Sequence, residues 1–247
     1  MASKTVLVTG ADRGFGLRVA QEFLRGGYTV FAGKFLDGFE LIDREAEANP
    51  GRFITVRLDV ESRDSILAMR DEVARHTDRI DVFVSNAAFM GGGPGGMPPP
   101  DLKESLIDVS LAEKSVRVNA LGALLCTEAL LPLMQTGMKR LCYVSSEVAS
   151  INQMMRDNGF RYPMSKTALN MAVRMLHNSL HGEGFTFRLY HPGPMRRMAS
   201  DGGLSGEADP KTDPSYSAGL AFPFFTGDRP DEDRLVMVDF LGYVWPF

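Results

Sequence analysis

A tyrosine and a lysine stand four positions apart in the pentapeptide YPMSK, as Tyr162 and Lys166. Side chains at this spacing lie on the same face of a helix. A free tyrosine hydroxyl has a pKa of about 10, and a neighbouring ammonium group lowers that pKa because it favours the phenolate. The pair therefore predicts a proton donor for the oxygen of a carbonyl substrate, with Lys166 activating Tyr162. A surface tyrosine beside a solvated lysine is the alternative that the spacing alone leaves open.

The glycine-rich stretch TGADRGFG, residues 9–16, follows a short β-branched run and precedes a helical pattern. Gly10, Gly14 and Gly16 let the backbone approach a pyrophosphate closely, and the helix start supplies N–H groups for it. The stretch therefore predicts a dinucleotide site, the alternative being an ordinary glycine-rich turn. The other loop residues that we assign to this site are Asp12, Arg13 and Phe15.

Strand-like and helical patterns alternate from residue 4 to residue 191. This alternation predicts a single α/β domain over residues 1–247, a doubly wound parallel sheet of about seven strands flanked by helices. We expect a long helix over 105–135, another over 162–180, and a late strand within 234–242. The irregular segments 90–102 and 194–228 are expected to form the walls of a substrate pocket.

The composition narrows the class of protein. A chain of 247 residues with 44% hydrophobic content can bury one substantial core, and a net charge of −4 argues against a nucleic-acid binder. Cys126 and Cys142 lie in apolar runs, which favours buried thiols and a cytoplasmic protein. We read no signal peptide, no uncharged apolar run of about 18 residues that would cross a membrane, and no metal site.

The glycine spacing Gly-x-x-x-Gly-x-Gly and the YPMSK motif together resemble the short-chain dehydrogenase/reductase family, over about residues 5–193. The segments YPMSKTALNMAVRMLHNSL and VDFLGYVWPF look most similar to C-factor-like carbonyl reductases. The resemblance implies a Rossmann fold. The other matching positions are Asp59 and Val60, NAA at 86–88, Asn119, the serine pair 145–146 and HPGP at 191–194.

The resemblance also implies catalytic roles. Lys166 would hold the nicotinamide ribose as well as activate Tyr162. Ser146 would steady the substrate oxygen, with Ser145 as the lesser candidate. Asn119 would hold a water that connects the lysine to solvent. For the two serines and for Asn119, an ordinary structural role is the alternative.

Cofactor contacts are implied in the same way. Asp59, with Val60 beside it, would contact the adenine, Asn86 the adenosine end, and Ala87 and Ala88 the cofactor through their backbone. The contacts implied around the nicotinamide and phosphates are Pro192, Gly193 and Met195. Many relatives carry a threonine after the Pro-Gly pair, where this chain has PMRRM. Arg196 or Arg197 would replace that contact, bind an acidic substrate group, or lie on the surface.

The choice of nicotinamide depends on the end of the second strand. NAD-specific sites place a carboxylate there, whereas this strand ends in VFAGKF. Lys34 and Arg13 would attract a 2′-phosphate, so we predict NADP(H) over NAD(H). A small register shift would bring Asp37 into that position instead, and Lys34 would then be a solvated loop residue.

These features predict an NADPH-dependent ketone reductase, with alcohol oxidation as the reverse reaction. The alternatives are a dinucleotide-binding regulatory protein with little turnover, and a non-redox relative such as a dehydratase or epimerase. By resemblance we expect a homodimer or homotetramer, and we expect the apolar end YVWPF to pack on a neighbouring subunit or over the pocket. The pocket residues that favour a substrate with a hydrophobic body are Phe89, Met90, Met97, Met154, Met155, Met195, Met198 and Phe222.

Overall fold

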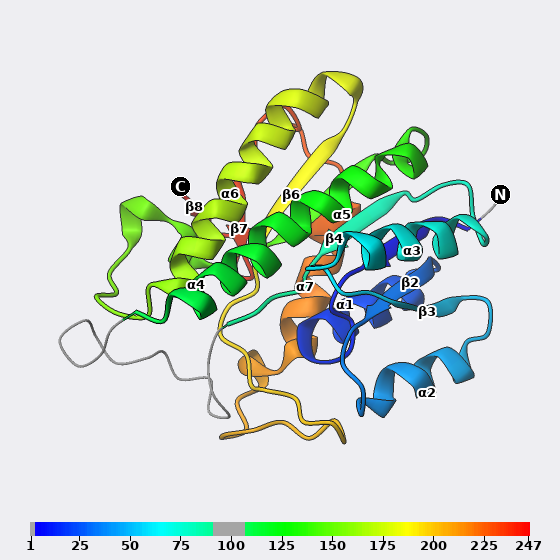
Figure 1. Cartoon of the computed structure of the whole chain (residues 1–247), viewed down its shortest axis with the longest axis horizontal. Coiled ribbons are helices and arrows are strands. Elements are labelled where there is room, and N and C mark those ends of the chain that lie inside the picture. Colours follow the sequence, from blue (N-terminus) through cyan, green and yellow to red (C-terminus); the bar gives the residue numbers. More distant parts are fainter. Residues whose placement is uncertain (1–2, 91–106) are drawn as a thin grey trace.

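The structure, a computed structural model, describes residues 3–90 and 107–247. One continuous sheet crosses the molecule, with helices on both of its faces (Figure 1). Its strands are β1 (Thr5–Val8), β2 (Thr29–Lys34), β3 (Phe53–Arg57), β4 (Val82–Ser85), β5 (Arg140–Val144), β6 (Thr186–His191), β7 (Met237–Asp239) and β8 (Val244–Trp245). The spatial order is β3-β2-β1-β4-β5-β6-β7-β8, and only β8 runs antiparallel to its neighbour. The strand order therefore reverses between β1 and β4, which is where such sheets open a ligand crevice.

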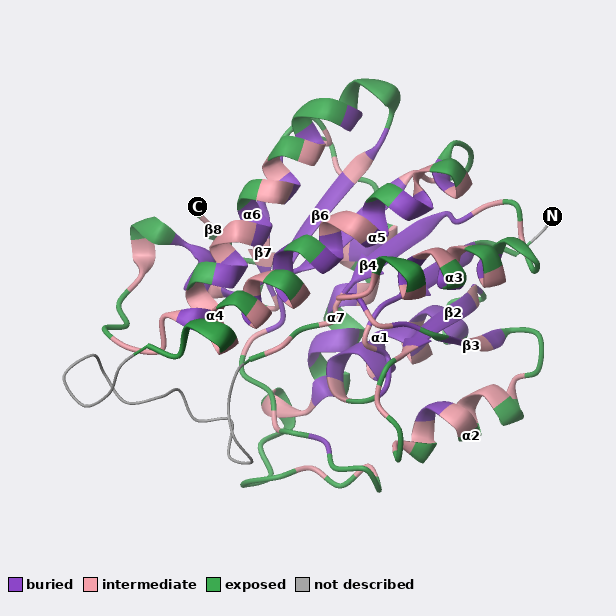
Figure 2. Ribbon diagram, viewed as in Figure 1, coloured by how far each residue is buried: buried purple, intermediate pink, exposed green. Residues whose placement is uncertain are grey.

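Helices cover both faces of the sheet. They are α1 (Gly14–Arg25), α2 (Glu40–Ala48), α3 (Arg63–Ala74), α4 (Val109–Val116), α5 (Gly122–Leu130), α6 (Arg161–Leu180) and α7 (Pro214–Thr226). One apolar core lies between the sheet and α3, α5 and α6, and a second lies between the other face and α1, α2 and α7. The strands are buried while the outer helix faces are exposed (Figure 2). Double coverage explains why the strands are apolar runs without alternation.

Side chains that precede three of the helices set where those helices begin. The hydroxyl of Ser62 accepts the N–H of Ser65 at 3.2 Å before α3. Asp108 and Asp213 cap α4 and α7 in the same way. Each cap satisfies a backbone N–H that the first turn of a helix leaves without a partner.

The expected long helix over 105–135 is continuous from Val109 to Met134, although its character changes along its length. A π-helical turn, Arg117–Leu121, joins α4 to α5, and a 3-10 turn, Leu131–Met134, ends the run. By length and composition alone this run could cross a membrane, but half of its apolar window is buried inside the fold. Cys126, Leu130 and Met134 lie in the first core, which is the ordinary use of such a helix.

Residues 214–226 correct the sequence prediction, which left 194–228 without regular structure. They form α7, which begins with Pro214 after its aspartate cap and contains Pro223. Ala218, Ala221 and Phe225 are buried in the second core. Because this segment mixes serines with small and aromatic residues, lacks charges and carries an internal proline, it shows no clear helical period in the sequence.

The predicted late strand is confirmed as β7, and the chain then turns back as the unexpected strand β8. Trp245 donates its indole N–H to Asp239 at 3.0 Å, and Ser150 donates its hydroxyl to the carbonyl of Pro246. The ring of Phe247 lies 5.7 Å from the Arg174 guanidinium. The apolar chain end therefore has partners within its own chain.

Candidate active site

The residues predicted to do chemistry come from six different strand ends, and the parallel sheet brings those ends to one edge. The glycine loop follows β1, Lys34 ends β2, Asp59 follows β3, Asn86 follows β4, Ser146 follows β5 and Pro192 follows β6. Helix α6 adds Tyr162 and Lys166, and the π-helical turn adds Asn119. The predicted grouping is thus reproduced by the fold, around the point where the strand order reverses.

The glycine loop is tightly packed at its base. Gly10 has a φ of +63°, which favours glycine, and a side chain on Gly16 would lie 2.2 Å from the carbonyl oxygen of Gly10. Asn86 donates its amide to the carbonyls of Thr9 and Gly10 at 2.9 and 3.0 Å. The side chain of Asn86, which the resemblance assigns to the adenosine end, therefore also holds the loop in shape.

Thr9 is a structural contributor that the sequence reasoning missed. Its hydroxyl oxygen accepts the N–H groups of Asn86 and Ala87, both at 3.0 Å. A side chain on Gly10 would lie 2.8 Å from the Cα of Ala87. Thr9 directly precedes the glycine motif, so its position in the sequence was a usable signal. The two strand-end loops that face the crevice are consequently joined to each other.

The N-terminus of α1 carries no acidic residue in its first turn, as a phosphate-binding helix start requires. In this structure the N–H of Gly14 points to the sulfur of Met198 at 3.3 Å, and Met198 is only 2% exposed. Arg13 donates to the carbonyl of Met198 at 3.2 Å and lies over the ring of Phe39. A phosphate that bonds to Gly14 must therefore displace this thioether.

Asp12 ties the glycine loop to the segment that follows β2. One of its carboxylate oxygens accepts the N–H groups of Phe35 and Leu36, both at 2.7 Å. Burial raises the pKa of Asp12, although these hydrogen bonds and the charge of Lys34 oppose the rise. The predicted cofactor residue Asp12 thus fixes the backbone on either side of the crevice.

Lys34 and Asp37 lie close together in sequence but have different partners. The ammonium of Lys34 contacts both carboxylate oxygens of Asp43, at 2.8 and 2.6 Å. Asp37 is 87% exposed on its side chain and pairs with Arg57 at 2.9 Å. Asp43, on α2, was not anticipated, and no sequence spacing signals this pairing.

The remaining predicted cofactor positions are mostly shaped by backbone and packing. Asp59 accepts the N–H of Glu61 at 2.9 Å, and Val60 packs closely against Gly122. Gly193 has a φ of +77°, and a side chain there would meet the ring of Phe240 at 2.4 Å. The other members of the set are Phe15 and Pro192, which are buried, and Ala88 and Met195, which are exposed.

Tyr162 and Lys166 lie one turn apart on α6, with the lysine ammonium 5.8 Å from the tyrosine ring centre. The ammonium donates to the carbonyl of Val144 at 2.8 Å, and Lys166 is only 2% exposed. Burial lowers the pKa of Lys166 to about 8. This lysine therefore exchanges its proton close to neutral pH.

The prediction that Lys166 lowers the pKa of Tyr162 is wrong for this structure. Burial and the nearby carboxylate of Glu147 raise the pKa of Tyr162 to about 12, while a hydrogen bond with Ser146 opposes the rise. Desolvation is the largest influence on Tyr162, and burial also disfavours the ammonium form of Lys166. Tyr162 is consequently a protonated hydroxyl, in the state required of a proton donor.

The two serines after β5 have different hydrogen-bond partners. Ser145 donates its hydroxyl to the amide oxygen of Asn170 at 2.7 Å, within the core. Ser146 is the residue that hydrogen-bonds to Tyr162. Its oxygen also accepts the N–H of Val148 at 3.4 Å. The geometry therefore favours Ser146 over Ser145 as the hydroxyl beside the reacting carbonyl.

Asn119 sits in the π-helical turn, where its side chain connects two parts of the site. It accepts the N–H of Phe89 at 2.6 Å and donates to the carbonyl of Phe89 at 2.9 Å. It also donates to the hydroxyl of Ser165 at 2.8 Å, and that hydroxyl donates to the carbonyl of Tyr162 at 2.7 Å. The Asn119 side chain thus anchors the start of α6 to the loop after β4.

Glu147 and His191 form a pair near Tyr162 to which the sequence analysis gave no role. The imidazole Nε2 of His191 contacts the carboxylate of Glu147, and this hydrogen bond lowers the pKa of Glu147. The ring of Trp245 lies edge-on to His191, with ring centres 6.0 Å apart. Glu147 directly follows the serine pair, so its place in the sequence was a signal for it.

Some residues predicted to line the substrate pocket lie elsewhere. Phe222 packs against Phe23 and Gly26 beneath α1 and is wrong as a pocket residue. Met97, like most of 90–102, lies outside the described residues. Arg196 lies 3.6 Å from the carboxylate of Asp213, which caps α7. Arg196, one of the two arginines considered as phosphate ligands, thus faces a carboxylate.

The comparisons with known proteins agree with this geometry. The family model for short chain dehydrogenase matches residues 4–201. An uncharacterized oxidoreductase of Schizosaccharomyces pombe is 27% identical over 96% of this chain and 90% of its own length. The C-signal protein of Myxococcus xanthus is 38% identical over 47% of this chain and 66% of its own. The predicted likeness to C-factor-like proteins is therefore confirmed.

Among solved structures, a carbonyl reductase from Pseudomonas aeruginosa PAO1 is 26% identical with a TM-score of 0.78, covering 99% of this chain and 100% of that one. The fold of that reductase and the family match both agree with the doubly wound sheet of this chain and with the residues gathered at the edge of the sheet. The chain belongs to the short-chain dehydrogenase family and is an oxidoreductase that acts on C=O or CH–OH groups.

Proposed function

We propose that this chain is an NADPH-dependent reductase of ketones in which Tyr162 is the proton donor. The observation that carries the proposal is the placement of Ser146, Tyr162 and Lys166 at the same sheet edge as the glycine loop. A hydride acceptor needs a proton donor beside its oxygen, and this edge offers both a dinucleotide cradle and a hydroxyl pair. Oxidation of a secondary alcohol is the reverse of the same chemistry.

The residues present fit a dinucleotide. A side chain at Gly16 would collide with the Gly10 carbonyl and so disrupt the tight loop. In addition, α1 begins without an acid, and Lys34 offers a cation at the end of β2. Gly10, Gly14 and Gly16 would hold the pyrophosphate, while Lys166 and the Pro192–Gly193 backbone would border the nicotinamide end. When bound, a reduced nicotinamide supplies the hydride that a carbonyl carbon accepts.

The chain itself supplies the proton and the orientation. Ser146 donates a hydrogen bond to the substrate oxygen, and the Tyr162 hydroxyl gives that oxygen its proton. Lys166, whose pKa is lowered to about 8, then holds a proton close to the phenolate and favours its return. The anchored N-terminus of α6 keeps the tyrosine in place through Ser165 and Asn119.

The preference for NADPH is supported by the partners of Asp37 and Lys34 at the end of β2. Asp37, the acid that would favour NADH, pairs with Arg57 and is exposed. Lys34 is enclosed, with 19% of its side chain exposed. A cation held at this position suits a 2′-phosphate better than a ribose hydroxyl.

The proposal is tested by NADPH consumption with a panel of ketones that carry hydrophobic groups. We expect Tyr162→Phe to lower kcat by about 10³ while the Kd for NADPH stays within twofold. Binding of NADPH without consumption by the wild-type chain would favour the regulatory alternative. Failure to bind either nicotinamide would contradict the cofactor assignment itself.

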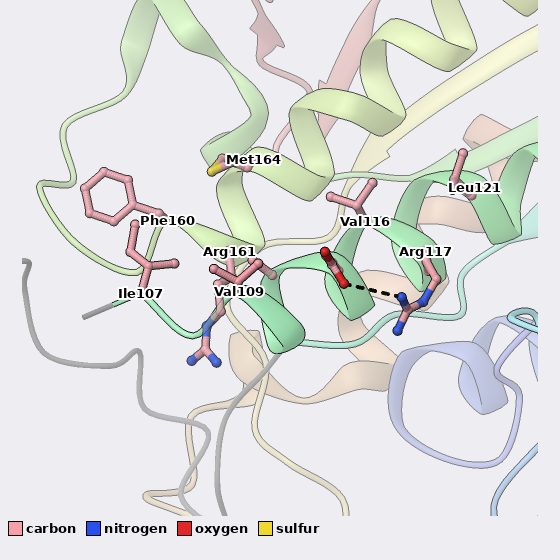
Figure 3. Close-up of a pocket in the computed structure, with 10 residues that line it drawn as sticks. Ile107, Val109, Val116, Arg117, Leu121, Phe160, Arg161 and Met164 are labelled. Atoms are coloured by element: carbon pink, nitrogen blue, oxygen red, sulfur yellow. Dashed lines mark ion pairs between the residues drawn. The ribbon is translucent and has the colours of Figure 1, made fainter. Parts of the chain in front are cut away.

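We further propose that the outer faces of α4 and α6 pair two copies of the chain. An apolar groove of about 520 Å³ runs between these helices, and its lining includes Val109, Val116 and Met164 (Figure 3). Met171 and Met175, also on α6, are more than half exposed. Light scattering is expected to show a dimer or larger in the wild type and a shift toward monomer in Met171→Glu.

A further inference from the structure

The end of β2 carries an ion pair that the proposed proton chemistry does not use. Lys34 is the last residue of β2, and its ammonium contacts both oxygens of the Asp43 carboxylate, at 2.8 and 2.6 Å. Asp43 lies in the first turn of α2. The lysine side chain is 19% exposed and the aspartate side chain is 44% exposed. The cation is therefore enclosed, while its partner reaches solvent.

Both partners stand on fixed backbone. The carbonyl of Lys34 accepts the N–H of Leu58 at 2.9 Å, and the two following N–H groups are held by Asp12. Ile42, next to Asp43, is fully buried in the second core. The carboxylate is also favoured by the partial positive charge of the helix start. The ion pair is consequently built into the site before any ligand arrives.

Neighbouring cations are engaged as well. Arg57, the register partner of Lys34 on β3, pairs with Asp37, and Arg13 donates to the carbonyl of Met198. For these three cations of the described region, an anion that enters this end of the crevice must compete with an existing partner. Lys34 is the most enclosed of the three, and its partner, Asp43, is a charged carboxylate at contact distance.

We propose that Asp43 competes with the 2′-phosphate of NADPH for Lys34 and so sets how strongly the chain discriminates NADPH from NADH. This inference rests on the proposed use of NADPH. A phosphate dianion and a carboxylate seek the same ammonium, and each repels the other. NADH carries an uncharged hydroxyl at that position and leaves the Lys34–Asp43 pair intact. Asp43 is thus a specificity-determining residue that limits the preference.

The size of the effect follows from the exposure of the pair. Ion pairs that are partly open to solvent contribute modestly, equivalent to about two- to fivefold in an equilibrium constant. Asp43→Asn keeps the shape of the side chain and removes its charge. The variant should therefore bind NADPH about two- to fivefold more tightly and leave NADH within about 1.5-fold of the wild type.

The experiment measures the Kd values of NADPH, NADH, adenosine 2′,5′-bisphosphate and AMP by calorimetry. The bisphosphate carries the 2′-phosphate without a nicotinamide, so it isolates this end of the site. Glu40→Gln is the matched control, because it removes one charge from the same helix at a residue that pairs with Arg44 rather than Lys34. Lys34→Met tests the cation itself.

Tighter binding of NADPH and of the bisphosphate to Asp43→Asn, absent in Glu40→Gln and abolished in the double variant with Lys34→Met, is the expected result. An equal gain for NADH and AMP, or no gain at all, would overturn the role of Asp43. If Lys34→Met weakens NADPH but Asp43→Asn changes nothing, this inference fails and the proposed cofactor stands. If Lys34→Met leaves NADPH binding unchanged, the proposed NADPH preference fails, and this inference with it.

Discussion

Arg140 and Arg188, at the start of β5 and along β6, are buried and fully engaged. Arg13 and Lys34, near the carboxyl ends of β1 and β2, instead hold partners that an incoming anion would have to displace. Arg188 donates to the carbonyls of Phe224, Phe187 and Gly227 and to the carboxylate of Glu232. Arg140 donates to the carbonyls of Phe225 and Gly227 at 3.1 and 2.8 Å.

Lys34, by contrast, forms its ion pair with the carboxylate of Asp43, and Gly14 donates to a thioether. Backbone carbonyls cannot leave their places without unfolding, while a surface carboxylate and a methionine side chain can rotate away. The first arrangement stabilises the fold and the second keeps an anion site formed but exchangeable. Among these four groups, replaceable partners mark the end of the sheet where an anion can bind, and backbone partners mark the end that serves the fold.

The largest effect is expected from removing the Glu232 carboxylate from its contacts with Arg188. Burial alone would raise the pKa of Glu232, yet hydrogen bonds from Arg188 and the Arg229 backbone keep that pKa below its usual value. Glu232→Gln leaves the Arg188 guanidinium, which is 0% exposed, without its counter-charge. We expect a loss of about 3 kcal/mol in the free energy of unfolding, measured by urea denaturation, with the Kd for NADPH unchanged. An unaltered free energy of unfolding would contradict the contrast between the arginines of β5 and β6 and the cations near β1 and β2.

A slightly smaller effect should separate the two serines after β5. Ser146→Ala removes the hydroxyl that hydrogen-bonds to Tyr162, and kcat for ketone reduction should fall by about 10²-fold. Ser145→Ala is the matched control, since it lies one residue away and donates to Asn170 in the core. It should lose about 1 kcal/mol of stability and keep kcat within threefold. The reverse pattern would make Ser145 the catalytic residue.

Replacing Lys166, the buried lysine of the proposed site, should stabilise the fold. Because the pKa of Lys166 is lowered from 10.5 to about 8 in the folded chain, its charge costs stability below about pH 8, and the cost fades as the pH rises toward 10.5. Lys166→Met removes that cost but loses one hydrogen bond, so a net gain of about 2 kcal/mol is expected at pH 7. Urea unfolding at pH 7 and pH 9.5 should show the advantage shrinking. An advantage that does not depend on pH would contradict the lowered pKa.

The smallest effect is expected at the pyrophosphate position. Met198→Ala frees the N–H of Gly14 from its thioether contact. NADPH and NADH should both bind about twofold more tightly, because they share the pyrophosphate, in contrast to the selective change expected for Asp43→Asn. Calorimetry with ADP-ribose checks the shared part alone. Tightening of one cofactor only would place Met198 near the ribose instead of the pyrophosphate.

Much of this arrangement was predictable because it depends on local pattern. The apolar runs of β1 to β6, the glycine loop and the Tyr162–Lys166 spacing each have a period or a motif that the sequence displays. Parallel strands then force their ends to one edge, so the grouping of the site follows from the strand order. The preference for Ser146 over Ser145, which came from the family resemblance, stays a prediction, and it is compatible with the hydrogen bond of Ser145 to Asn170 in the core.

Other features depend on contacts between segments far apart in the chain. The helix α7 lacks a polar face, so its pattern does not reveal it, and β8 is only two residues long. The contact of Met198 with Gly14 spans 184 positions. The raised pKa of Tyr162 comes from burial, which only the packed structure defines. Predictions that rest on charge alone fail where desolvation is the larger effect.

The central claim is that this edge of the sheet transfers a hydride to a carbonyl carbon and a proton from Tyr162 to its oxygen. The most direct test follows deuterium from NADPH labelled at the reactive position of the nicotinamide into a ketone, with the product read by mass spectrometry. The account predicts one deuterium on the carbinol carbon with the wild-type chain and about 10³-fold slower labelling with Tyr162→Phe. A product altered without deuterium would instead indicate a non-redox relative, and bound cofactor with no transfer to any ketone would indicate a regulatory protein.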